Sequence, residues 1–184
     1  MWDTIGNWDL SLYRYINLQL TSPAWDPFMV FVSKEAVAAW LFGAAILIAL
    51  GLRRRYALKV LAALGFVFLV SDALCTNILK PTFHRVRPCH HQFDARRMDG
   101  ICGSTFGMPS NHAASTAAMA TVLAVFAPWP VAAVAFLAVL VTSYSRVYLG
   151  VHYPGDVLAG IAVGIALGAL VSRLLRSQIR GSLK

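Results

Sequence analysis

The sequence predicts an all-α integral membrane protein, a bundle of about five transmembrane helices with an amphipathic helix at its N-terminal end. Of its 184 residues, 58% are hydrophobic and 13% are charged, and the mean hydropathy is +0.64. An ordinary soluble domain is less apolar and more charged. The apolar residues form separate runs along the whole chain, most of them near the roughly twenty residues that cross a bilayer. We therefore expect one membrane-embedded domain over residues 1–184.

The N-terminal segment, residues 1–22, is expected to form an amphipathic helix in the membrane interface. Trp2 and Trp8 are residues that favour this interface. The side chains that recur there at helical spacing are Leu10, Tyr13, Ile16, Asn17 and Leu20. The sequence TSPAWDP at 21–27 then ends the helix, because its prolines interrupt backbone hydrogen bonding.

Five apolar runs follow, and each is expected to be a transmembrane helix. Lys34 and Glu35 interrupt the first run near one end, so they are expected at an interface or beside a polar cleft. The fourth run is short for a span unless its helix continues to Tyr148. The runs cover residues 28–52, 57–79, 109 to the APWP turn at 127–130, 131–144 and 156–175.

The basic residues set the expected orientation, because clusters of Lys and Arg mark the cytoplasmic ends of spans. These clusters contain Arg53, Arg54, Arg55, Lys59, Arg173, Arg176, Arg180 and Lys184. Five spans then place residues 1–22 and the loops 80–108 and 145–156 on the outer face. Since much of the net charge of +8 lies in such short clusters, we expect no nucleic-acid partner.

The outer face is also basic, against the positive-inside rule. Its cations are Lys80, Arg85, Arg87, Arg96, Arg97 and Arg146. Loop charge that the rule tolerates is one explanation, and an anion site is the other. The residues around these cations favour the anion site.

Three segments are expected to meet at this face: KPTFHRVRP from Lys80, MPSNHAAS around Ser110, and SRVYLGVHYPGD ending at Asp156. Ser110 is a good N-cap, and a helix N-terminus offers free N–H groups and partial positive charge to an anion. Lys80, Arg87 and Arg146 add three positive charges, and guanidinium groups bind phosphate oxygens in pairs. A phosphate monoester or diphosphate matches this arrangement best.

His152 and Asp156 form a candidate catalytic pair. The chain turns at Pro154 and Gly155 between them, and Pro154 suits the first position of a helix, so the carboxylate can reach back. A carboxylate bonded to one imidazole nitrogen fixes the tautomer and leaves the other nitrogen as a nucleophile. Two histidines at helix starts, His112 and His152, beside a carboxylate and three cations favour catalysis over a structural role.

The three segments resemble the three-part signature of the type 2 phosphatidic acid phosphatase family, which also contains acid phosphatases and vanadium haloperoxidases. The matching residues are Lys80 with six residues before Arg87-Pro88, the run Pro109-Ser110-Asn111-His112, and Ser145-Arg146 with five residues before His152 and three more before Asp156. They occur in the expected order. One position departs from the pattern, because the family usually has glycine where Asn111 stands.

The resemblance implies a role for each matched residue. His152 would be the nucleophile that forms a phosphohistidine, Asp156 would orient it, and His112 would protonate the leaving group. The phosphoryl oxygens would be held by Lys80, Arg87, Ser110, Asn111 and Arg146, with N–H groups at the start of the third span. This scheme requires no metal, so we expect neither a cofactor nor a metal site.

The substrate is expected to be a lipid phosphate, because a pocket between spanning helices can admit a tail sideways while the headgroup meets the cations. Small bacterial members of the family resemble undecaprenyl-diphosphate phosphatases. The first prediction is therefore a metal-independent undecaprenyl-diphosphate phosphatase of the bacterial inner membrane, with its active site facing the periplasm. Alternatives are a lipid A phosphatase or phosphotransferase, and a phosphatidylglycerophosphate or phosphatidic acid phosphatase. A non-catalytic phospholipid-binding or transport protein is disfavoured, since binding needs no oriented nucleophile.

Two cysteines of the 80–108 loop, Cys89 and Cys102, are expected to form a disulfide in an oxidising periplasm and hold the loop over the pocket. Closing so short a loop stabilises a fold by about 3 kcal/mol. A zinc site is the alternative, but the spacing of the nearby histidines fits no usual ligand pattern. These histidines are His84, His90 and His91.

Polar residues also occur deep in the second span, where Asp72 lies near Ser71, Thr76 and Asn77. A carboxylate in lipid usually faces a partner or a water-filled cavity. We interpret Asp72 as a residue that stabilises the bundle and leave it out of the catalytic set. A stripe of small residues on the last span indicates close helix packing; it consists of Gly160, Gly164 and Gly168.

Overall fold

The computed structural model describes residues 2–34, 54–92, 94–96 and 102–181, which are mostly helical. The N-terminal part contains α1 (Trp2–Arg14), a π-helical turn (Tyr15–Gln19) and a helix at 26–34. The middle part contains α3 (Arg54–Leu74), a second π-helical turn (Cys75–Leu79), α4 (Lys80–Phe83) and α5 (Pro88–His91). Three long helices complete the fold: α6 (Asn111–Phe126), α7 (Trp129–Tyr148) and α8 (Pro154–Arg180).

Three helical stretches are long and apolar enough to cross a membrane: Arg55–Phe83, Trp129–Tyr148 and Pro154–Ile179. They correspond to the second, fourth and fifth predicted runs. The fourth run gains its missing length because α7 continues to Tyr148. The first predicted span, 28–52, lies mostly outside the described residues, so the count of five spans stays a prediction.

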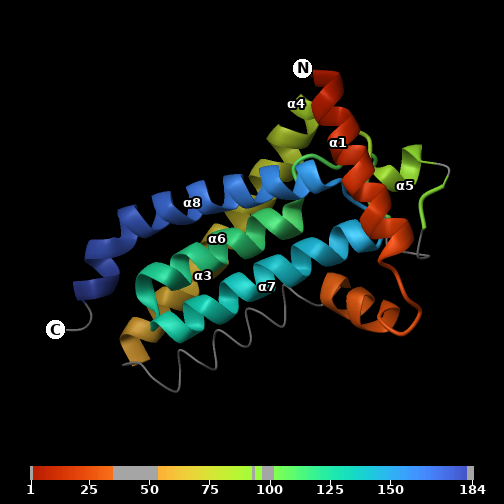
Figure 1. The fold of residues 1–184 in the computed structure, drawn as a ribbon. Coiled ribbons are helices and arrows are strands. Elements are labelled where there is room, and N and C mark those ends of the chain that lie inside the picture. The colour runs from red at the N-terminus through yellow and green to blue at the C-terminus, as the bar shows by residue number, and fades with distance from the viewer. Residues whose placement is uncertain (1, 35–53, 93, 97–101, 182–184) are drawn as a thin grey trace.

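α6 lies at the centre of the bundle and packs against α3, α7 and α8 (Figure 1). Its 16 residues correspond to about 24 Å at helical rise, which is shorter than a hydrocarbon core of about 30 Å. Most of its side chains are buried by its neighbours, and its role as a membrane span stays a prediction. It is apolar on all sides, and alanines such as Ala113 and Ala114 are fully buried, so the surrounding helices can approach closely.

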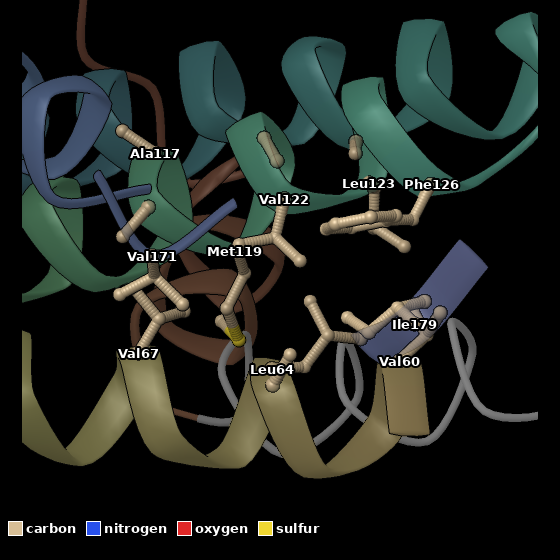
Figure 2. Close-up of a cluster of buried hydrophobic side chains, with 14 of the residues drawn as sticks. Val60, Leu64, Val67, Ala117, Met119, Val122, Leu123, Phe126, Val171 and Ile179 are labelled. Carbon is tan, nitrogen blue, oxygen red and sulfur yellow. The ribbon is translucent and has the colours of Figure 1, made fainter. Parts of the chain in front are cut away.

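A continuous apolar core holds this arrangement together. Figure 2 shows Val60 and Leu64 of α3 together with Met119 and Phe126 of α6, and Val171 of α8 joins the same cluster. All five side chains are at most 5% exposed. The core fixes the directions of α6 and α8, which both begin at the same end of the bundle (Figure 1).

The predicted small-residue stripe of α8 packs against the first half of α6. A Cβ atom at Gly164 would lie 2.2 Å from the carbonyl oxygen of Ala114, and one at Gly160 would lie 2.6 Å from that of Ser110. Because the two helices touch backbone to backbone, their starts are held in register. The backbone N–H of Ser110 consequently donates to the carbonyl oxygen of Asp156 at 3.0 Å.

α1 lies across the end of the bundle where α8 begins and α7 ends (Figure 1). One side of this N-terminal segment is buried, since Tyr13 and Asn17 are 0% exposed, whereas Trp8 is 76% exposed. The Asn17 amide donates to the carbonyl oxygen of Tyr148 at 2.8 Å, which attaches the segment to the end of α7. An N-terminal helix is therefore present, and its location in a membrane interface stays a prediction.

Candidate active site

A cavity of about 420 Å³ opens at this end of the bundle and collects residues from all three predicted segments. It is lined by Ser33, Lys34, Asp72, Thr76, Lys80, Arg87, Gly103, Ser104, Asn111, His112, Arg146 and His152. Two further predicted residues, Ser110 and Asp156, are 0% exposed and adjoin this lining. Segments more than 60 residues apart in sequence thus meet at one site.

Local turns direct the side chains inward. α4 ends at His84, whose left-handed conformation (φ 49°) reverses the chain before Arg87. α8 begins at Pro154, and a reciprocal capping interaction lets the backbone N–H of Tyr153 donate to Asp156 at 3.0 Å. The carboxylate is thereby oriented back toward His152.

The imidazole of His152 is held between a carboxylate and a guanidinium. Its Nδ1 lies 3.4 Å from Oδ2 of Asp156, and its Nε2 lies 2.8 Å from Nη1 of Arg87. Because a guanidinium only donates, Nε2 accepts and Nδ1 carries the proton directed at Asp156. Burial lowers the pKa of His152 well below its usual value, and the charges of Arg87 and Arg146 lower it further. The imidazole is therefore neutral, with the lone pair of Nε2 facing Arg87.

Three cations of the site are nearly buried: Lys80 is 8%, Arg87 5% and Arg146 6% exposed. Arg87 Nε donates to the carbonyl oxygen of Ser104 at 2.7 Å, and Arg146 donates to the hydroxyl of Ser33. In the described part of the chain, none of the three cations forms an ion pair with a carboxylate. Buried charges are costly unless paired, so this cluster has the character of an anion site.

Polar atoms beside the cations point to the same conclusion. Among the described residues, Oγ of Ser110, Oδ1 of Asn111 and Nε of Arg146 are buried without a hydrogen-bond partner. An unsatisfied buried polar atom costs about 1–3 kcal/mol, so such atoms are rare unless a ligand completes them. Ser110 also precedes α6, whose first N–H groups have no partner within the helix.

His112 lies on the first turn of α6 and lines the cavity. Its imidazole bonds the backbone carbonyl oxygen of Ser33. A carbonyl only accepts, so the bonded nitrogen carries a proton and the other nitrogen is left for a second interaction. His112 therefore has a fixed orientation at the edge of the cation cluster.

A family comparison agrees with this site. The PAP2 superfamily model matches residues 60–180, a range that includes all three segments. The chain belongs to the PAP2 superfamily. The predicted family is thus confirmed, and the chain is a membrane phosphatase that hydrolyses phosphate esters.

Known proteins resemble this PAP2 chain over most of its length. It is 29% identical over 170 residues to the lipid A 4'-phosphatase of Bacteroides thetaiotaomicron, covering 89% of the chain and 75% of that protein. It is 28% identical over 188 residues to the putative undecaprenyl-diphosphatase YbjG of Escherichia coli, covering 93% and 84%. The crystal structure of Aquifex aeolicus LpxE matches with a TM-score of 0.68 and 25% identity, covering 89% of this chain and 94% of that one.

Two residues that sequence reasoning did not assign to the site hold the carboxylate of this PAP2 chain. Arg85 Nη1 donates to Oδ1 of Asp156 at 2.9 Å, and Arg85 also forms an ion pair with Asp9 of α1. Asp9 in turn accepts the backbone N–H of Gly155 at 2.7 Å. Arg85 is one of the cations grouped near the predicted anion site in the sequence, whereas nothing in the sequence pointed to Asp9, which is 76 residues away from Arg85.

Ser33 is a third residue that the sequence did not reveal, although it contacts both His112 and Arg146. The only signal nearby was the polar pair that interrupts the first apolar run. Lys34 of this pair lines the cavity, in agreement with the expected polar cleft, and Glu35 lies outside the described residues.

The interpretation of Asp72 changes. The sequence pattern indicated a residue that stabilises the bundle, but the structure places Asp72 and Thr76 on the cavity wall of the PAP2 site. Asn111 Nδ2 donates to Oδ1 of Asp72 at 2.6 Å and to Oγ1 of Thr76 at 2.8 Å. The residue that departs from the family pattern is thus bonded to this carboxylate.

The loop at 80–108 contains the predicted Cys89–Cys102 disulfide, with a Cα–Cα distance of 6.2 Å. His90 lies close to both sulfurs, but sulfurs in a disulfide do not supply the thiolates that a zinc site needs. Arg96 forms an ion pair with Asp26 and does not line the cavity, and Arg97 lies outside the described residues.

Proposed function

We propose that this PAP2 protein removes the terminal phosphate of a membrane lipid through a phosphohistidine at His152, facing the periplasm of a bacterial inner membrane. One observation carries the proposal. A neutral histidine with a carboxylate on Nδ1 presents Nε2 to a cavity that three unpaired buried cations surround. Simple phosphate binding would need the cations but not an oriented nucleophile.

In the first step, Arg87 moves its hydrogen bond from Nε2 of His152 to a phosphoryl oxygen, and the freed lone pair attacks phosphorus while the P–O bond to the leaving group breaks. His112 gives its proton to the departing oxygen, and Asp156 stabilises the charged imidazole through the Nδ1 proton. Lys80, Arg87 and Arg146 balance the charge on the non-bridging oxygens. The products are a phosphohistidine and the protonated leaving group, which is an alcohol from a phosphate ester and a lipid phosphate from a diphosphate.

In the second step, a water molecule attacks the phosphohistidine. Neutral His112 accepts a proton from this water, the P–N bond breaks, and its electron pair returns to Nε2 of His152. Inorganic phosphate leaves, and both histidines regain their starting states. The same residue thus acts first as acid and then as base.

The protonation of His112 depends on the substrate. Three neighbouring cations oppose a further positive charge on its imidazole. A bound phosphate dianion offsets these charges, so His112 gains its proton when the substrate is present. The Ser33 carbonyl already fixes the ring orientation that proton transfer requires.

The specific lipid is a finer proposal. The sequence placed undecaprenyl diphosphate first and lipid A second, with phosphatidylglycerophosphate and phosphatidic acid as further alternatives. The relatives named as a lipid A 4'-phosphatase and as a putative undecaprenyl-diphosphatase align with similar shares of this chain, 89% and 93%. The first two substrates differ in the group beside the scissile phosphate, which is a second phosphate in one and a sugar in the other.

The test is phosphate release by detergent-purified protein from each of these lipids, with EDTA present. We expect release from at least one lipid, its loss in His152→Ala, and an acid-labile phosphohistidine in the wild type during turnover. Wild-type turnover by His152→Ala would refute the nucleophile assignment. Turnover that requires an acceptor lipid would make the protein a phosphotransferase instead.

A further inference from the structure

We propose that Asp72, Thr76 and Asn111 form a headgroup subsite that selects lipids whose scissile phosphate is attached to a hydroxyl- or amide-bearing group such as a sugar. These three residues are called the polar wall below. The inference rests on the proposed function and specifies its substrate class. It disfavours lipid diphosphates.

The polar wall is part of the same cavity as the cations. Asp72 and Thr76 come from α3 and the π-helical turn that follows it, and Asn111 begins α6. All three line the cavity together with Lys80 and His112. Asn111 directly precedes His112, the proton donor to the leaving group under the proposed function. The wall therefore lies on the side where the group attached to the phosphate must be accommodated.

The hydrogen bonds of Asn111 determine what the wall offers a ligand. A carboxylate only accepts, so the Nδ2 group of Asn111 must face Asp72, as its 2.6 Å contact shows. The second amide contact, to Thr76 at 2.8 Å, uses the same nitrogen. Oδ1 of Asn111 then points away from both and is buried without a partner among the described residues.

The wall consequently presents two acceptors, the Oδ1 atom of Asn111 and the carboxylate of Asp72, beside one donor, the hydroxyl of Thr76. A ligand group that fits must bring donors, and sugar hydroxyls and amide N–H groups supply them. A site built to hydrogen-bond a substrate group discriminates against analogues that lack it, and here the buried Oδ1 atom of Asn111 would stay unpaired.

Charge gives a second reason. Lys80, Arg87 and Arg146 surround the place for the scissile phosphate, whereas Asp72 puts a negative charge on the wall beside it. A second phosphate next to the first would meet this charge, and the Thr76 hydroxyl is the one side-chain donor that the wall would offer it. Lys34 is the other cation that lines the cavity; like Asp72 it is exposed, so both charges are weakened by solvent relative to those of the buried cations.

The bonds of Asn111 support a role in selectivity rather than in chemistry. Its Nδ2 group donates to Asp72 and to Thr76, which uses both amide protons and leaves none for the scissile phosphate. The wall is therefore an addition to the phosphate site.

The experiment compares kcat/KM for an acylated sugar phosphate, a prenyl diphosphate and phosphatidic acid in wild type, Asn111→Gly and Asp72→Asn. We expect the wild type to prefer the sugar phosphate over the diphosphate by at least about tenfold. In both variants, the ratio of kcat/KM for the sugar phosphate to that for phosphatidic acid should fall about tenfold or more. Asn77→Ala, which removes an amide from the same helical segment outside the cavity lining, should leave that ratio unchanged.

A second measurement does not depend on the variants folding. In the wild type, glucosamine phosphate should inhibit phosphatidic acid turnover at lower concentration than pyrophosphate does. The reverse order, or an unchanged selectivity ratio in folded variants, would overturn the inference while leaving the phosphatase intact. If no lipid is hydrolysed, or if turnover survives in His152→Ala, the proposed function itself has failed.

Discussion

Replacing Arg85 by glutamine should slow the chemical step without weakening substrate binding. Arg85 does not line the cavity, and its direct link to the site is a 2.9 Å hydrogen bond to Oδ1 of Asp156, beside its ion pair with Asp9. Asp156 is 0% exposed, and the Arg85 side chain is 29% exposed. The bond is therefore charge-assisted and largely shielded from water, and losing it should cost about 2 kcal/mol. If that stabilisation is expressed at the transition state, kcat should fall about 30-fold while KM changes little.

The assay is steady-state phosphate release, combined with an NMR measurement of the His152 Nδ1 proton. Arg85→Lys should recover part of kcat because it keeps one donor and the charge. Arg14→Gln is the matched control, since Arg14 pairs with Asp94 on the surface, where both side chains are nearly half exposed. A rise in KM as large as the fall in kcat, or an unchanged Nδ1 resonance, would refute the positioning role.

Three further predictions concern His152, the helix packing and the Cys89–Cys102 disulfide. Because burial lowers the pKa of His152, its imidazole should be neutral at pH 6 in substrate-free protein. The unfolded chain binds a proton there below about pH 6.5, so the native state should lose stability as the pH falls through that value. An imidazole 15N titration with a midpoint at or above about 6.5 would contradict this. Gly164→Leu should prevent native packing, because even a Cβ atom there would lie 2.2 Å from the carbonyl oxygen of Ala114. If the variant melts in detergent at the same temperature as the wild type, α8 packs differently. Cys102→Ser should destabilise the protein by about 3 kcal/mol, because the bridge to Cys89 closes a loop of 13 residues. Thermal melting with and without reductant checks this, since the reductant should lower the melting temperature of the wild type and leave that of the variant unchanged.

The parts of the site that local sequence determines were predictable. His152 and Asp156 lie four residues apart across a Pro154–Gly155 turn, so the short-range geometry alone brings the carboxylate to the imidazole. The start of α6 at Asn111 followed from Pro109 and Ser110, which suit a helix N-terminus. The apolar runs likewise predicted the three long spanning helices, because length and hydropathy are properties of each segment by itself.

The unpredicted parts depend on which segments meet. Asp9 reaches the site only because α1 crosses the end of the bundle, and no periodicity within residues 1–22 encodes that crossing. Asp72 reaches the cavity on a helix that includes a π-helical turn at Cys75–Leu79, which changes the register between Asp72 and Lys80. Ser33 lies on a helix with no catalytic signature of its own. In each case, a single segment carries too little information to identify its partner.

The site also explains why this end of the bundle keeps a cluster of buried cations. Lys80, Arg87 and Arg146 are buried with no carboxylate partner among the described residues, so they destabilise the substrate-free fold. The apolar contacts of α6 with α3 and α8 supply stability at a distance from these charges. A phosphate that enters the cavity supplies the missing negative charge. Its binding is therefore strongest beside the cations that lack a partner in the substrate-free protein. The same arrangement favours a transition state over a ground state, because the charge on the transferring phosphoryl oxygens lies where the cations are already fixed.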